Sequence, residues 1–75
     1  MKNQVKEIGR VKIKEDQAIV VSLINDESLD IRLFLNLEGY KGPTKKGVRL
    51  YLFDNNWEEF FKIMQKVNEV YEKLA

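Results

Sequence analysis

The residue types in this chain argue against catalysis. Its 75 residues include no histidine and no cysteine, so the commonest general base, the thiol nucleophile and the usual zinc ligands are missing. The sequence also lacks a glycine-rich phosphate loop and a carboxylate pair with acid–base spacing. Asp26-Glu27 offers oxygen ligands to a hard cation, but turns select such residues for local backbone reasons. We therefore predict that the protein is not an enzyme and uses no metal or other cofactor.

Recognition chemistry is suggested by one alternating stretch, residues 29–36. Successive side chains of a strand leave by opposite faces, so four apolar side chains share one face and four others share the second. The apolar set predicts a core face. The second set places a cation beside an aromatic ring on a face that patterning alone would leave polar. The two sets are Leu29, Ile31, Leu33 and Leu35, and Asp30, Arg32, Phe34 and Asn36.

Basic and aromatic residues in neighbouring segments extend this mixed surface. Cations attract phosphates and aromatic rings stack on unpaired bases, so the combination favours single-stranded nucleic acid without strong sequence preference. An exposed cation taken alone more often only solubilises a sheet or discourages edge pairing, so the prediction rests on the collective pattern. The predicted binding residues are Arg10, Lys12, Lys14, Arg32, Phe34, Tyr40, Lys41, Lys45, Lys46, Arg49 and Tyr51.

The surrounding elements are predicted from hydrophobic periodicity. Period-two alternation indicates four strands, over residues 5–15, 18–24, 29–37 and 48–52. Gly9 predicts a bend, a bulge or a close backbone approach in the first strand. The nearly continuous apolar run of the second predicts a strand that is covered on both faces or lies centrally. Turns are expected at 15–17 and 25–28. A loop is expected over 38–47, which holds three of the four glycines and the only proline.

After Phe53 the apolar spacing changes to a helical period. The expected N-cap is Asp54 or Asn55, and the helix is expected to end at residue 73 or 74. Trp57, in the first turn, is predicted to anchor the core, and Phe53 and Tyr71 are predicted to be packing residues. The architecture is therefore α+β, with four antiparallel strands followed by one C-terminal helix.

The apolar stripe of this helix is wider than one small sheet needs, which predicts a second copy of the chain as its partner. A 75-residue domain buries only roughly 60% of its unfolded surface, and without disulfides or zinc an oligomer is the most direct source of extra stability. The predicted dimer interface comprises Phe61, Ile63, Met64, Val67, Val70, Tyr71 and Leu74.

Charge is segregated along the chain although the net charge is only +1. Residues 1–14 hold five basic side chains against Glu7, whereas the segment from Asp54 onward holds five acidic side chains and three lysines, which predicts one cationic face. The chain shows no domain linker, so residues 1–75 are expected to form a single domain. With no signal-like apolar run and no stretch of about 20 apolar residues, we expect a soluble, intracellular protein without a membrane contact.

The order of these motifs resembles the C-terminal domain of the transcriptional coactivator positive cofactor four and its bacterial and phage relatives. The resemblance begins at Ile8-Gly9-Arg10-Val11-Lys12 and continues through Leu29-Asp30-Ile31-Arg32-Leu33-Phe34. It then includes Lys41, Lys45-Lys46-Gly47-Val48-Arg49-Leu50 and Trp57. Two positions depart from the family pattern, since Glu15-Asp16-Gln17 replaces an aromatic and lysines, and Leu35 replaces a tryptophan of the eukaryotic form.

The resemblance implies a homodimer that binds single-stranded DNA and acts in transcription, replication or repair. Carried over by position, Arg10, Lys12, Arg32, Lys41 and Lys46 would contact phosphates, and Phe34, Tyr40 or Tyr51 would take over base stacking. It implies a cytoplasmic, nucleoid-associated location in a bacterium or phage, a nuclear one in a eukaryote, and transcription or replication proteins as partners. Two alternatives stay open: RNA binding, and a small dimeric interaction module whose basic face docks an acidic protein.

Overall fold

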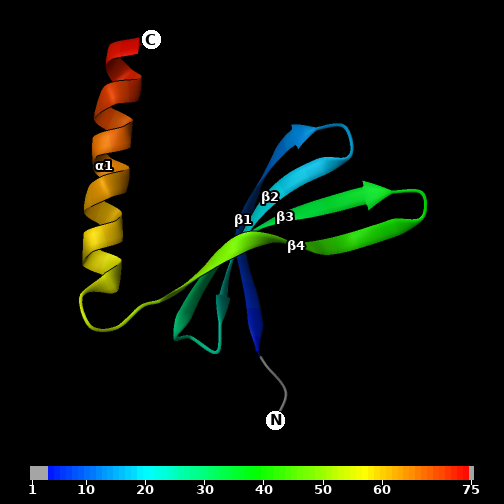
Figure 1. Cartoon of the computed structure of the whole chain (residues 1–75), viewed down its shortest axis with the longest axis horizontal. Coiled ribbons are helices and arrows are strands. Elements are labelled where there is room, and N and C mark those ends of the chain that lie inside the picture. Colours follow the sequence, from blue (N-terminus) through cyan, green and yellow to red (C-terminus); the bar gives the residue numbers. More distant parts are fainter. Residues whose placement is uncertain (1–3, 75) are drawn as a thin grey trace.

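Four antiparallel strands and one C-terminal helix make up the chain in a computed structural model, which describes residues 4–74. The strands lie in one sheet in the order β1-β2-β3-β4, so every connection within the sheet is a hairpin (Figure 1). The predicted α+β class and ββββα order are confirmed. Lys2, counted above in the basic N-terminal segment, lies outside the described residues. The elements are β1 (Val5–Lys14), β2 (Gln17–Ile24), β3 (Ser28–Leu37), β4 (Tyr40–Tyr51) and α1 (Asn56–Leu74).

The last strand is much longer than its sequence predicts. The expected loop over residues 38–47 is wrong, because only Glu38 and Gly39 form a turn and β4 begins at Tyr40. β4 is an edge strand, where Pro43 can lie without interrupting a ladder on both sides. A bulge absorbs the remaining irregularity, since Leu33 is the single β3 residue opposite residues 44–46 of β4. The Thr44 hydroxyl closes the bulge by donating to the Leu33 carbonyl at 2.8 Å.

The core lies around the inner strand β2. All eight residues of β2 are buried or half-buried, which confirms its predicted central place. The expected assignment of one face to the core is only partly right, because Leu29 is buried whereas Ile31, Leu33 and Leu35 are half-buried. On the same face Val11 and Val48 are 61% and 65% exposed. Within residues 4–74 no element covers these two side chains, so this apolar face stays open. Within residues 4–74 the buried residues are Val20, Ser22, Ile24, Leu29 and Asp30, of which only Val20 is fully buried.

A tight turn separates the sheet from the helix. Asp54 and Asn55 both have positive φ, at 59° and 67°, a conformation that Asn and Asp tolerate better than most residues. The Asn56 amide donates to the Phe53 carbonyl at 3.2 Å, and the first helical bond runs from Glu59 N–H to Asn55 O at 3.1 Å. The predicted start and end of the helix are therefore confirmed.

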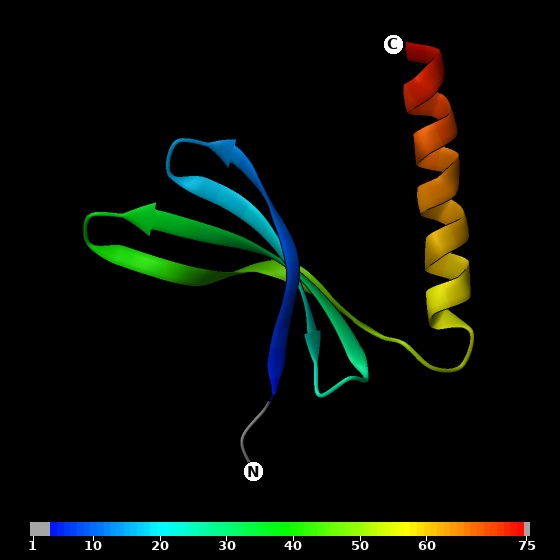
Figure 2. The ribbon, with the colours of Figure 1, turned by 180° about the vertical axis from the view of Figure 1, so that it is seen from behind.

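The helix stands away from the sheet and buries none of its side chains (Figures 1 and 2). The predicted core role of Trp57 is wrong within the single chain, because its side chain is 41% exposed. Its ring stacks on Phe61 at 5.6 Å and borders an open apolar hollow together with Leu29 and Leu52. Phe53 and Tyr71, also predicted to pack, are exposed as well. No helix within residues 4–74 is long and apolar enough to cross a membrane. The helical period determines which apolar side chains lie along one stripe. In the single chain this stripe is not covered by the sheet.

Candidate nucleic-acid interface

Cross-strand register gathers most of the predicted cations on one face of the sheet. Directly paired residues of antiparallel strands point to the same side. Val20 pairs with both Arg10 and Arg32, and Ala18 pairs with both Lys12 and Phe34. The pairs Asn36–Lys41 and Asp30–Arg49 continue this series onto β4. We call this side the cationic face and define it by Arg10, Lys12, Arg32, Phe34, Lys41 and Arg49.

A groove of about 410 Å³ crosses the cationic face near the tips of the β1–β2 and β3–β4 hairpins, which extend from the same end of the sheet (Figure 1). Its floor is low at Ala18, because a methyl group lies between the longer side chains of Lys12 and Phe34 on the paired strands. We call it the hairpin groove. Its lining residues are Arg10, Lys12, Glu15, Asp16, Gln17, Ala18, Phe34, Leu35, Asn36, Lys41 and Gly42.

Arg10 is held over the ring of Phe34. Its guanidinium carbon lies 5.7 Å from the ring centroid, within the range of a cation–π contact. The Glu7 carboxylate also holds the guanidinium, accepting from Nε at 2.9 Å and from Nη2 at 2.7 Å. The hydrogen bonds from Arg10 lower the pKa of Glu7, and those to Glu7 raise the pKa of Arg10. The groove therefore has an aromatic wall and a positioned cation beside it.

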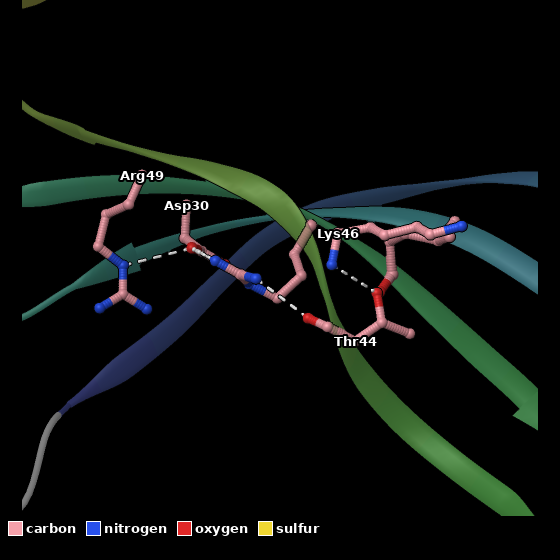
Figure 3. Close-up of polar contacts among 6 residues, drawn as sticks. Asp30, Thr44, Lys46 and Arg49 are labelled. Carbon is pink, nitrogen blue, oxygen red and sulfur yellow. Dashed lines mark hydrogen bonds and ion pairs between the residues drawn. The ribbon is translucent and has the colours of Figure 1, made fainter.

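Arg32 is engaged in hydrogen bonds within the chain. Its Nε and Nη2 donate to the Asp30 carboxylate at 3.0 and 2.8 Å, and its Nη1 donates to the Thr44 carbonyl at 3.0 Å. Its side chain is only 20% exposed, so the expectation of a solvent-facing cation is wrong. Arg49 adds a third bond to Asp30, from Nε at 3.3 Å (Figure 3). Asp30, which alternation places on the same face as Arg32, is buried there.

The two arginines keep Asp30 ionised. The hydrogen bonds from Arg32 are the largest influence on the pKa of Asp30 and lower it, while partial burial raises it and Arg49 lowers it further. The same bonds raise the pKa of Arg32. We call Asp30, Arg32 and Arg49 the Asp30 network. It joins β3 to β4 next to the bulge and leaves the outer edge of Arg49 exposed.

The remaining predicted residues lie outside the hairpin groove. A register shift pairs Lys14 with Gln17, and hence aligns it with Leu35 of the apolar series, so Lys14 leaves the cationic face. Tyr40 pairs with Leu37 in that same apolar series and donates its hydroxyl to the Pro43 carbonyl. Lys45 and Lys46 lie exposed in the β4 bulge, and the Tyr51 ring meets Phe53 edge-on at 5.1 Å.

Several lining residues were missed by sequence reasoning. Ala18 reads as an ordinary strand residue, and only its register against Lys12 and Phe34 makes it the floor of a groove. Asp16 was assigned to a turn, and its place in the groove follows from a bond that its carbonyl accepts from the Asn36 amide at 2.8 Å. The ion pair between Asp30 and Arg32 could have been predicted from the sequence, because residues two apart on a strand share a face.

Within residues 4–74 no group of three or more acidic side chains is placed to hold a metal ion. The site is therefore described by its cations, its aromatic ring and its hydrogen-bonding groups. Comparison of the chain with models of protein families, with curated proteins and with solved structures gave no match to any of them.

Proposed function

We propose that this protein binds single-stranded nucleic acid, in a manner largely independent of sequence, and that it acts as a homodimer. The single observation that carries the proposal is the hairpin groove, which is lined by the cations Arg10, Lys12 and Lys41 together with the ring of Phe34. Phosphates are attracted by the three cations, while an unpaired base has a π face that stacks on the ring. In a duplex the base faces already stack on one another, so the arrangement favours single strands.

The Asp30 network limits which cations take part. Three donors of Arg32 are engaged within the chain, so its main contribution is to hold β3 against β4. Arg49 is bound through Nε alone and is half exposed. We therefore assign phosphate contacts chiefly to Arg10, Lys12 and Lys41, with Lys45 and Lys46 of the bulge as outer contacts. Stacking is assigned to Phe34 rather than to Tyr40 or Tyr51, because neither tyrosine lines the groove.

The homodimer is supported by the uncovered helix. Most of the stability of a helix in a protein comes from packing of its apolar face rather than from intrinsic propensity. Helix α1 has 19 residues and buries none of them, and its outermost stripe residue, Leu74, is 80% exposed. Contiguous apolar surface of this kind on a soluble protein commonly marks an interface. A second copy supplies an identical stripe and an equally open apolar sheet face.

The proposal is tested by fluorescence polarisation with labelled oligonucleotides of equal length. We expect single-stranded DNA to bind more tightly than duplex DNA at the same salt concentration. For single strands, log Kd should change with log salt with a slope of about 0.7 per phosphate neutralised. Affinity that does not change with salt, or that favours the duplex, would overturn the proposal. A parallel RNA series decides between the two kinds of single strand, and involvement in transcription, replication or repair stays a prediction of the resemblance.

A further inference from the structure

Acidic and amide side chains share the hairpin groove with its cations. Glu15 and Asp16 come from the β1–β2 turn and Asn36 from the end of β3. A carboxylate repels phosphate, so these residues would weaken a groove that only received a phosphate backbone. They are well placed, however, to meet the hydrogen-bonding edge of a base whose phosphate lies on the lysine side.

Asp16 is the better positioned of the two acids. The Glu15 side chain is 98% exposed, and its Oε2 lies 3.9 Å from Lys12 Nζ, which is a loose and solvated ion pair. The Asp16 residue is half-buried, and its carbonyl oxygen accepts from the Asn36 amide at 2.8 Å, which ties the turn to β3. Among residues 4–74 the Asp16 carboxylate forms no hydrogen bond or ion pair, so its lone pairs are available to a ligand.

The size of the hairpin groove above Ala18 suits one base. Its volume of about 410 Å³ falls at the lower end of the roughly 300–1,000 Å³ usual for ligand sites. The Arg10 guanidinium lies over the Phe34 ring, so the two groups together form one side of the groove, and a base can stack on either flat group. Asp16 and Asn36 line the same groove as Phe34, so a base stacked there shares the groove with their polar groups.

We propose that the hairpin groove holds one unpaired base and that Asp16 selects bases carrying an exocyclic amine over thymine and uracil. A carboxylate only accepts hydrogen bonds. Cytosine and adenine present an amine donor, and guanine presents both an amine and a ring N–H. Thymine and uracil present one N–H flanked by two carbonyl oxygens, which a carboxylate disfavours. The inference rests on the proposed function and adds a base preference to an otherwise sequence-independent mode.

The test compares oligo-dC with oligo-dU of equal length by polarisation at neutral pH and fixed salt. Both bases are pyrimidines without a ring methyl group, so stacking area and backbone charge are matched. We expect oligo-dC to bind about five- to tenfold more tightly, the lower part of the range for one base-edge contact. In Asp16→Asn, whose amide both donates and accepts, the ratio should approach one. Asp26→Asn removes the same charge from the other turn, at a positive φ that Asn tolerates, and should keep the ratio.

A second variant tests the hollow itself. Ala18→Leu fills the floor without changing any charge, so binding of both oligonucleotides should weaken while the slope against salt stays the same. Equal binding of oligo-dC and oligo-dU by the unchanged protein overturns the base preference and leaves the proposed function standing. A preference that survives Asp16→Asn also overturns it. If neither oligonucleotide binds, the proposed function fails together with this inference.

Discussion

The guanidinium of Arg32 clasps the carboxylate of Asp30, two residues earlier on the same strand, with Nε and Nη2 donating at 3.0 and 2.8 Å. A two-bond pair of this kind is stronger and more directional than a single neutral hydrogen bond. Arg49 of β4 adds a bond to the same carboxylate, and Thr44 accepts from Arg32. The pair therefore links two strands next to the bulge. We expect its loss to lower the free energy of unfolding more than the affinity for nucleic acid.

Asp30→Asn should destabilise the fold by about 2–3 kcal/mol, because it leaves a partly buried arginine without its charged partner. The measurement is urea unfolding followed by circular dichroism. Glu15→Gln is the matched control, because the Glu15 side chain is 98% exposed. Loss of its charge should change the unfolding free energy by less than about 0.5 kcal/mol. Equal midpoints for the two variants would show that the network is not a structural link.

The same carboxylate predicts an acid-sensitive contribution to stability. In the folded chain the pKa of Asp30 is below its ordinary value of 3.8 because of its bonds to Arg32. The unfolded chain therefore takes up a proton first, so this contribution is complete above the ordinary value and is lost as pH falls through the lower folded pKa. Unfolding midpoints measured from neutral pH downward should fall more steeply for the unchanged protein than for Asp30→Asn. Glu7, whose pKa is also lowered, is common to both and cancels in the comparison.

Gly47→Ala should destabilise the sheet by about 1–3 kcal/mol through overpacking. An added Cβ would lie 2.7 Å from the Ile31 carbonyl oxygen and 3.0 Å from both the Cα and the guanidinium carbon of Arg32. The alanine must therefore displace backbone or the Asp30 network. Gly39→Ala is the control, because a Cβ there meets nothing within 4 Å. The measurement is thermal unfolding of the two variants. Similar unfolding midpoints would contradict the close packing inferred around Gly47.

Periodicity alone was sufficient to predict four strands and a helix, because the change of period after Phe53 is sharp. It failed for residues 40–47, whose glycines, proline and lysines are locally typical of a loop. Pairing with β3 overrides those local preferences, as the pairs Phe34–Pro43 and Arg32–Gly47 illustrate. Such pairs depend on how β4 folds back on β3, and the residue types of the segment alone do not show this pairing.

The candidate site was predictable in part for the same reason. Alternation placed Arg32 and Phe34 on one face, and that placement is right. Alternation alone does not show that Arg32 donates hydrogen bonds to Asp30. Nor does it show that Ala18 lines a groove together with Phe34, because that depends on the pairing of strands. The position of the helix could not be predicted either. An amphipathic pattern identifies the apolar stripe but not the surface against which the stripe packs.

Phe34→Leu should weaken binding of single-stranded DNA by about 1–3 kcal/mol, the usual contribution of one stacked base. Leucine keeps much of the apolar bulk but removes the π face, so the loss should appear in affinity with little change in circular dichroism. Phe53→Leu is the matched control, because this exposed ring lies outside the groove and contacts Tyr51 instead. Polarisation titrations with one oligonucleotide compare the two. If both variants bind like the unchanged protein, stacking is not centred on Phe34.

Val67→Asp should convert the proposed dimer to a monomer, because it places a charge in the exposed apolar stripe of α1. Because packing of the apolar face supplies most of the stability of a helix, helical circular dichroism should fall together with the sedimentation coefficient. Gln65→Asp introduces the same side chain into the same helix at a polar position, so it separates loss of the interface from the lower helix propensity of Asp. Analytical ultracentrifugation at micromolar concentration is the measurement. An unchanged protein that sediments as a monomer with a fully formed helix would remove the basis for the dimer, whatever the two variants do.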